Sequence, residues 1–210
     1  MSRKRPFNVE GLFFFELKAM KKLYSIVLLA FCTCMQPLVL QAQEAPQAQP
    51  SGDLVFLDRY YEMKETYPKM KDLWGLYAAS PHALTRFIER YNEIKASYPQ
   101  MTAVWGNYAG SNYTMEEFMA RFYAIHDAYP KMTGAYGAYA ASTKTMEEFI
   151  KRYYQIKDSD RSLMRYFSVY AGSDNSLQDF SARYYSIQAS NPALKDACGN
   201  YAGSKYRLSK

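Results

Sequence analysis

Cysteine is scarce in this chain of 210 residues, which contains three: Cys32, Cys34 and Cys198. The first two fall in an N-terminal stretch with the layout of an export signal, so only Cys198 remains in the rest of the chain. A single thiol makes no intramolecular disulfide. The fold must therefore be held by its apolar core.

An excess of one charge is also missing once the N-terminal stretch is set aside. The chain has 26 basic and 20 acidic residues, and residues 1–42 hold six of the former and two of the latter. Subtracting them leaves 20 and 18, a net charge of +2. A nucleic-acid-binding protein would need a basic stripe, so we exclude nucleic acid as a partner.

Histidine is rarer still, since the chain has two. This scarcity leaves few copies of the residue that most often serves as a catalytic base or a metal ligand. Neither His82 nor His126 belongs to a cluster with metal-ligand spacing,. The sequence has no glycine-rich phosphate loop, nucleophile elbow or Cys/His pair,. The adjacent acids Glu116 and Glu117 are explained by a helix start, where negative charge is favoured. We predict a protein that is not an enzyme and needs no cofactor or metal.

The single strongly apolar run lies near the N-terminus, in MKKLYSIVLLAFCTCMQPLVLQAQ from Met20 onward. Two lysines precede the run, and Leu40-Gln41-Ala42 offers a cleavage site. This layout is typical of a secretory signal peptide over residues 20–42. The run is short for a permanent transmembrane helix. We therefore expect an exported protein, periplasmic, cell-surface or extracellular, without a stable transmembrane segment after cleavage.

The flanks of this leader complete the N-terminal organisation. Residues 1–19 would bury the leader's positive start, so we interpret them as a mis-annotated extension. Residues 43–52, rich in Pro, Gln and Ala, are typical of a flexible linker,. Lipidation of Cys32 or Cys34 is an alternative that is not favoured, because the residues before them fit a lipoprotein signal poorly.

What the chain has in abundance is repetition. A phenylalanine followed three residues later by arginine recurs every 31 residues, with a Tyr-Ala pair and a closing serine in the same register. The five Phe/Arg pairs are Phe56/Arg59, Phe87/Arg90, Phe118/Arg121, Phe149/Arg152 and Phe180/Arg183. Such self-similarity is the signature of a repeat architecture, in which stacked units bury one another's apolar faces.

Each unit has the pattern of two helices. Capping boxes start the first helix at Thr114 and Thr145, and Ser176 starts a weaker version,. Apolar residues then recur at spacings of three and four. Prolines 68, 99, 130 and 192 are predicted at the first position of a shorter second helix. Glycines 110, 172 and 203 are predicted to end it in a left-handed conformation, and glycines 75, 106, 137 and 199 inside it predict close helix packing.

Residues 53–210 are therefore predicted to be all-α, an α-solenoid of five 31-residue helix-turn-helix repeats. The unit resembles a tetratricopeptide-type hairpin, whose small, aromatic, small and proline positions are matched in spacing by Phe118, Phe122, Ile125 and Pro130. The unit is three residues shorter, and Phe118 stands where that family keeps a small residue. The resemblance implies an α-solenoid and carries no binding residues to this chain.

Two recurring residue types are candidates for binding. A second strip beside the apolar stripe holds tyrosines that could form an aromatic ladder on a concave surface: Tyr61, Tyr123, Tyr154 and Tyr185. Plain packing is the alternative for these tyrosines and the favoured reading for the phenylalanines. For the arginines we favour a structural role, with the head group bonding helix-end carbonyls or a neighbouring carboxylate, over ligand binding.

The fourth repeat departs from the others, in KDSDRSLMRYF at 157–167. Asp160 can cap a helix there, and Arg161 and Arg165 are candidates for a specific partner-binding site. In the fifth repeat, Cys198 replaces an aromatic residue. We expect a buried thiol in a terminal repeat whose outer neighbour is absent.

The sequence thus favours an exported, non-enzymatic helical-repeat protein that presents a binding surface to a protein, peptide or glycan. The alternative is a structural or spacer protein of the cell envelope, held at the membrane by a lipid or an uncleaved leader. The sequence does not choose among the three kinds of partner.

Overall fold

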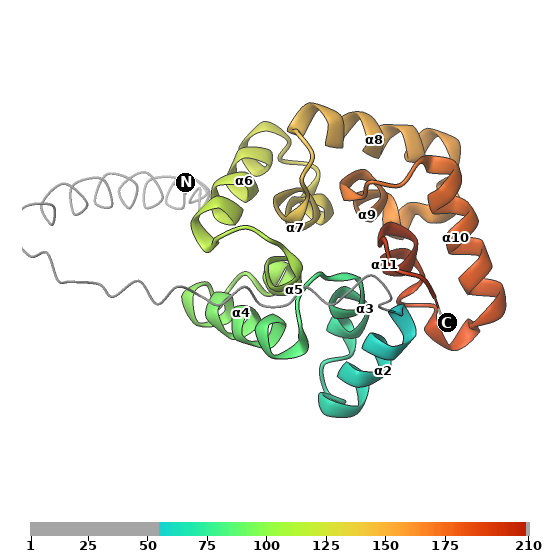
Figure 1. Ribbon diagram of the computed structural model, residues 1–210. Helices are drawn as coiled ribbons and strands as arrows, with labels where there is room; N and C mark the ends of the chain where they lie inside the picture. Colours follow the sequence, from blue (N-terminus) through green and yellow to red (C-terminus); the bar gives the residue numbers. More distant parts are fainter. Residues whose placement is uncertain (1–54, 209–210) are drawn as a thin grey trace, which may run out of the picture. The chain divides into compact units, whose positions relative to one another are not determined.

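The structure is a computed structural model that describes residues 55–208 (Figure 1). The expected N-terminal extension (1–19), signal peptide (20–42) and linker (43–52) lie outside the described residues. Within the described range, each 31-residue unit folds into a longer helix followed by a shorter one.

The longer helices form an outer layer and the shorter ones an inner layer (Figure 1). The outer helices are α2 (Phe56–Thr66), α4 (Leu84–Ser97), α6 (Met115–Ala128), α8 (Met146–Ser159) and α10 (Leu177–Ser190). The inner helices are α3 (Lys71–Ala79), α5 (Trp105–Gly110), α7 (Tyr136–Ala141), α9 (Phe167–Gly172) and α11 (Cys198–Gly203). Short 3₁₀ segments precede the last four: η1 (Thr102–Val104), η2 (Thr133–Ala135), η3 (Arg161–Tyr166) and η4 (Pro192–Leu194). The predicted all-α fold with five repeats is confirmed.

Outer helices begin at the predicted caps. The Glu117 amide donates to the Thr114 hydroxyl at 3.3 Å, and the Thr114 amide donates to the Glu117 carboxylate at 2.9 Å. This reciprocal pair satisfies two amides that the helix leaves without partners. The amide-to-hydroxyl bond recurs at the next two outer helices, from Glu148 to Thr145 and from Asp179 to Ser176.

The expectation that proline opens each second helix is wrong for three of the four prolines. Pro68, Pro99 and Pro130 lie in the turn between the helices, and Pro192 alone among the four opens a helical segment. The turn is closed by a backbone bond, such as the Met132 amide donating to the Tyr129 carbonyl at 3.0 Å. A turn of this kind suits the fixed backbone angle of proline equally well.

The expected left-handed glycines are also wrong. Gly110, Gly172 and Gly203 are the last residues of their helices, and the serine that follows each is extended. Small residues are needed there because the neighbouring repeat lies close. A Cβ added to Gly172 would lie 3.2 Å from the Ser142 Cβ and 3.3 Å from the Ala138 carbonyl oxygen. Close packing over the glycines inside the inner helices is confirmed, since a Cβ on Gly106 would lie 2.6 Å from side-chain carbons of the preceding inner helix.

Consecutive repeats are joined by one recurring aromatic contact. A tyrosine of each inner helix meets the phenylalanine of the next outer helix edge-on, with ring centroids 5.4 Å apart: Tyr77–Phe87, Tyr108–Phe118, Tyr139–Phe149 and Tyr170–Phe180. These phenylalanines are fully buried. The packing role favoured for the phenylalanines is therefore confirmed.

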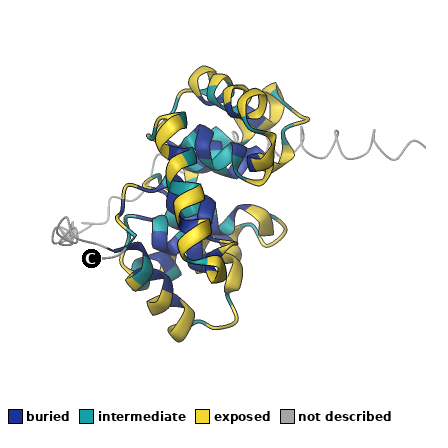
Figure 2. Ribbon diagram, turned by 90° about the vertical axis from the view of Figure 1, so that its right-hand side faces the viewer, coloured by how far each residue is buried: buried dark blue, intermediate teal, exposed yellow. Residues whose placement is uncertain are grey.

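The fifth repeat packs against the first in the same way, so the repeats close into a ring (Figure 1). The Phe56 and Tyr201 rings are again 5.4 Å apart, and α11 packs against α3. The chain after α11 forms a parallel bridge between Val55 and Arg207, in which the Phe56 amide donates to the Arg207 carbonyl at 2.8 Å. Figure 2 shows the buried residues gathered on the inner helices and on the facing sides of the outer ones.

Cys198 is fully buried, as expected, but the expectation that its repeat lacks an outer neighbour is wrong. The small thiol has a different physical reason. In the fourth repeat, Tyr166 stands where the other repeats have Leu, Val or Ala, and its ring lies over Gly199. In the other repeats, the outer-helix aromatic residue equivalent to Tyr184 packs against the aromatic residue at the Cys198 position. Tyr184 packs instead against Tyr166, with ring centroids 5.2 Å apart. The Cys198 position therefore needs no aromatic ring in the fifth repeat.

Candidate functional site

The recurring arginines hold the ends of the inner helices. The Arg121 guanidinium donates to the carbonyls of Tyr139 at 3.1 Å and of Ser142 and Lys144 at 2.8 Å. It also lies over the Tyr139 ring, 4.4 Å from the centroid. The other four make equivalent contacts within their own repeats: Arg59, Arg90, Arg152 and Arg183. The structural role favoured for these arginines is confirmed.

The residue two positions after each closing serine reaches into the next repeat. His82 Nε2 lies 2.7 Å from the Ser111 carbonyl oxygen. Tyr206 closes the ring, since its hydroxyl donates to the Ser80 carbonyl at 2.9 Å across 126 residues. The remaining three residues of this position also contact the next repeat: Tyr113, Lys144 and Asn175. This position therefore fastens each repeat to its neighbour.

The four candidate tyrosines, which we name the outer tyrosines, lie on the outer layer. Between 36% and 44% of each residue is exposed: Tyr61 on α2, Tyr123 on α6, Tyr154 on α8 and Tyr185 on α10. Each packs edge-on against the aromatic residue before it, at centroid distances of 5.3 to 5.7 Å. The interior is lined by the inner helices instead (Figure 1). The predicted ladder on a concave surface is therefore wrong, because closure distributes these residues around the ring.

Asp160 caps η3, as the sequence indicated, and also holds one outer tyrosine. Its carboxylate accepts from the Ser162 amide at 3.0 Å and from the Tyr185 hydroxyl at 2.7 Å. Hydrogen bonds from Ser162 and then Tyr185 hold the pKa of the Asp160 carboxyl below its usual range. Arg161 is the next residue in the chain and is exposed. It places a positive charge beside the Asp160 carboxylate in the sequence.

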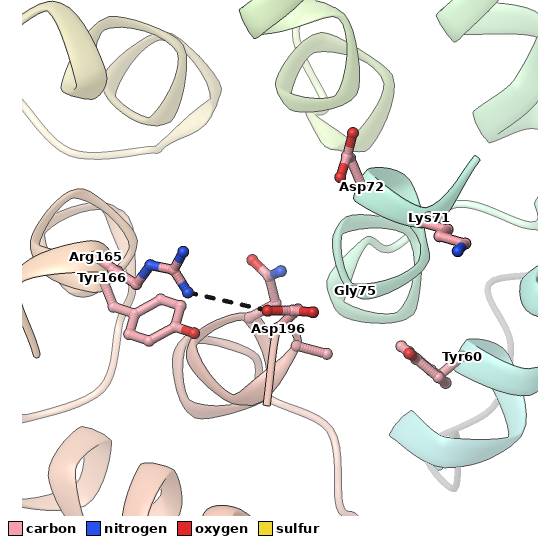
Figure 3. Close-up of a pocket in the computed structure, with 9 residues that line it drawn as sticks. Tyr60, Lys71, Asp72, Gly75, Arg165, Tyr166 and Asp196 are labelled. Carbon is pink, nitrogen blue, oxygen red and sulfur yellow. Dashed lines mark ion pairs between the residues drawn. The ribbon is translucent and has the colours of Figure 1, made fainter. Parts of the chain in front are cut away.

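A cavity of about 320 Å³ lies where repeats four, five and one meet, and we name it the seam cavity (Figure 3). Arg165 lines it, whereas Arg161 does not. Sequence reasoning thus found one residue of this cavity and missed the others, which are Tyr60, Lys71, Asp72, Gly75, Tyr166, Asp196, Ala197 and Asn200.

The seam cavity carries charges of both signs. Arg165 Nη1 and Asp196 Oδ1 are 4.0 Å apart, with side chains 79% and 81% exposed (Figure 3). An exposed pair at this distance contributes little to stability. The side chains of Lys71 and Asp72 make no hydrogen bond or ion pair with the described residues. Two cationic and two anionic side chains therefore line the cavity, and the one ion pair among them, Arg165–Asp196, is long and exposed.

Repeat register was the signal that could have found the cavity. Asp72, Arg165 and Asp196 share one position of the repeat, which holds Ala103 and Gly134 in repeats two and three. At this position, a charged residue therefore occurs in repeats one, four and five and not in repeats two and three. Only ring closure makes these three repeats consecutive, and the residue pattern alone does not show closure.

A second cavity of about 200 Å³ is lined by residues of all five inner helices. Its lining consists mainly of Ser, Ala and Gly and contains no charged residue. Asn200 lines both cavities. These small side chains are also those that allow neighbouring inner helices to pack closely.

No group of three or more His, Cys, Asp or Glu side chains within residues 55–208 could hold a metal ion. None of the helices described there is long and apolar enough to cross a membrane.

Comparisons with protein-family models, curated proteins and solved structures gave no match. The chain is a helical-repeat protein with paired helices and a 31-residue period. Its likeness to tetratricopeptide hairpins rests on this architecture alone.

Proposed function

We propose that this chain is an exported, non-enzymatic binding protein that holds a protein, peptide or glycan partner through its outer tyrosines. One observation carries the proposal. The same position of the outer helix exposes a tyrosine in four of the five repeats, although the neighbouring positions of that helix face are polar or buried.

Exposed tyrosines are suited to binding because they offer a large apolar ring with a polar tip. The outer tyrosines are also well supported. Each rests edge-on against a neighbouring aromatic ring, and lysines lie over two of them, Lys64 near Tyr61 and Lys157 near Tyr154. A side chain held in this way loses little conformational freedom on binding.

The arrangement around a ring favours a partner that is engaged at several points. Four similar contacts on one rigid body raise the overall affinity above that of any single contact. Arg161 adds a positive charge next to the Asp160–Tyr185 pair. Export is supported by the layout of residues 20–42, as argued from the sequence.

The alternative function, a spacer of the cell envelope held by a lipid or an uncleaved leader, receives less support from a ring. An open stack has end repeats onto which further copies can be added. The contact between α11 and α3 uses both of those end faces within one chain.

The experiment is a pull-down with the full chain as bait against envelope extract and extracellular fluid, quantified by mass spectrometry. In the test variant, Tyr61, Tyr123, Tyr154 and Tyr185 are replaced by Asn, the residue that repeat two carries at this position as Asn92. In the control, Met164→Thr removes another exposed apolar side chain and introduces the residue found at that position in repeats two and three.

A saturable partner that is retained by the control and lost by the fourfold variant supports the proposal. A partner that the fourfold variant retains contradicts it. Absence of any partner, together with native protein that stays in the membrane pellet after a salt wash, favours the spacer alternative.

A further inference from the structure

We propose that the seam cavity binds a small zwitterion, a molecule with one ammonium and one carboxylate group on a compact frame, as in a free amino acid. This site goes beyond the function proposed above, since it uses different residues from the outer tyrosines.

The fold does not require the charged residues at the Arg165 position of the repeat, which line the cavity. The positions that build the ring keep one residue type in every repeat, as the recurring Phe, Arg and Ser show. The position of Arg165 holds Asp, Ala, Gly, Arg and Asp from repeat one to repeat five. Since Ala103 and Gly134 support the same fold, packing does not demand charge at this position.

Two residues that differ from those at the same positions of the other repeats, Tyr166 and Cys198, shape the wall of the cavity. Tyr166 is the single large residue at a position that is otherwise Leu, Val or Ala, and its hydroxyl donates to the Lys195 carbonyl at 2.9 Å. Its ring covers Gly199 and meets Tyr184, which the small Cys198 leaves without a large partner in its own repeat. An aromatic wall therefore stands beside Arg165 (Figure 3).

The charges match a ligand that carries both signs. Arg165 and Lys71 can donate to a carboxylate, and Asp72 and Asp196 can accept from an ammonium. Arg165 and Asp196 face one another across 4.0 Å (Figure 3). Because this separation exceeds that of a hydrogen-bonded pair, a ligand can replace the Arg165–Asp196 pairing with its own groups without breaking a strong protein contact.

The volume limits the size of the ligand. A cavity of about 320 Å³ is at the low end of the range for small-molecule sites, roughly 300–1,000 Å³,. Gly75 and Ala197 also line the cavity, and the Asn200 amide supplies a neutral donor and acceptor,. An amino-acid-sized molecule is accommodated, whereas a folded protein segment is not.

The test uses ligand-observed NMR of the full chain with the twenty free amino acids, followed by calorimetric titration of those that bind. N-acetyl-L-leucine amide, which lacks both charges, and methyl glucoside are the comparison probes. Arg165→Ala and Asp196→Ala introduce the residue that repeat two has at this position. Lys71→Thr is matched by the control Lys195→Thr, which lies at the same repeat position but does not line the cavity.

We expect saturable binding of at least one free amino acid, weakened tenfold or more by Arg165→Ala and Asp196→Ala and unchanged in Lys195→Thr. Circular dichroism establishes that each variant is folded. Absence of saturable binding by every free amino acid overturns the proposal. So does equal binding of the capped amide, or unchanged affinity in folded Arg165→Ala protein. Binding of methyl glucoside alone overturns the ligand class. Loss of the macromolecular partner in the tyrosine variant leaves this test unaffected.

Discussion

The ring of Phe56 lies edge-on to the ring of Tyr201, with centroids 5.4 Å apart and planes at 68°. The four joints between consecutive repeats have the same centroid distance and angles of 67° to 69°. The contact between the first and last repeats is therefore the same as the contacts inside the chain. Closure buries both end faces, which an open stack would have to cover with polar capping repeats.

Phe56→Leu should lower the free energy of unfolding by about 1–2 kcal/mol, because a buried ring is replaced by a smaller side chain and an edge-to-face contact is lost. The matched variant is Phe118→Leu, at the same position in the middle of the chain. Urea unfolding followed by circular dichroism measures both. Equal losses are expected, and a loss at Phe56 well below that at Phe118 would indicate an open first repeat.

Gly75→Ala should destabilise the protein by about 1–3 kcal/mol, the range for inserting volume into a packed site. A Cβ on Gly75 would lie 3.1 Å from the Ala197 Cβ and 3.3 Å from the Ala197 Cα, both in the fifth repeat. Without closure, the same change would stabilise the helix by up to about 1 kcal/mol. Thermal unfolding measures the change: a lower midpoint indicates the closed ring, and a higher midpoint indicates an open stack. Gly134→Ala is the control, since nothing lies within 4 Å of its added Cβ.

Arg121→Met should cost about 3 kcal/mol, because hydrogen bonds to a charged group each contribute roughly 1.5–3 kcal/mol and several carbonyls lose their donor together. Arg121→Lys should recover little of this, since one ammonium cannot replace a fork that bridges three carbonyls,. Arg161→Met, at an exposed position, should stay within about 0.5 kcal/mol of the parent,. A loss of partner binding without a loss of stability in Arg121→Met would refute the structural role.

Stability should decrease as the pH falls below about 6.5, the ordinary pKa of histidine, because of His82. Burial, with smaller effects from Arg90, Arg86 and Arg59, lowers the pKa of His82, and the bond to the Ser111 carbonyl opposes this shift. The unfolded chain then binds a proton that the folded chain binds more weakly. The His82 contribution is therefore complete above the unfolded pKa and is lost as the pH falls through it toward the folded pKa.

His82→Asn should remove this part of the pH dependence, measured as the free energy of unfolding between about pH 7 and 5. The fold accepts Asn at this position, since Asn175 of repeat four donates to the carbonyls of Ala202 and Ser204. His126→Lys, at an exposed position that holds Lys in three repeats, is the control for replacing a histidine. An unchanged slope in His82→Asn would assign the effect to other groups.

Local structure could be predicted because short-range chemistry decides it. Residue types at fixed spacing predict three features: the caps at Thr114, Thr145 and Ser176, the burial of the recurring phenylalanines, and the arginines that donate to helix-end carbonyls. The prolines and terminal glycines were misplaced because the same residues suit two kinds of helix end. Contacts with the neighbouring repeat, such as those of Gly172, decided between them.

Closure could not be predicted because it depends on the small rotation from one repeat to the next. Five equal rotations sum to a full turn only when the packing geometry is known. The seam cavity follows from closure, since it joins Asp72 of the first repeat to Arg165 and Asp196 of the last two. Hence Arg165 was identified as an irregularity of its repeat, and the residues facing it were not.

The most direct test of the closed ring is a comparison of two spin-label distances by pulsed electron paramagnetic resonance. Glu65, Ala96 and Ala189 are exposed at the same position of α2, α4 and α10, in repeats one, two and five. Labels are attached to cysteines introduced there, in a chain whose three native cysteines are replaced. The ring predicts that the 65–189 distance equals the 65–96 distance, because each pair is one repeat apart. A 65–189 distance several times longer than the 65–96 distance would show an open solenoid and contradict the account.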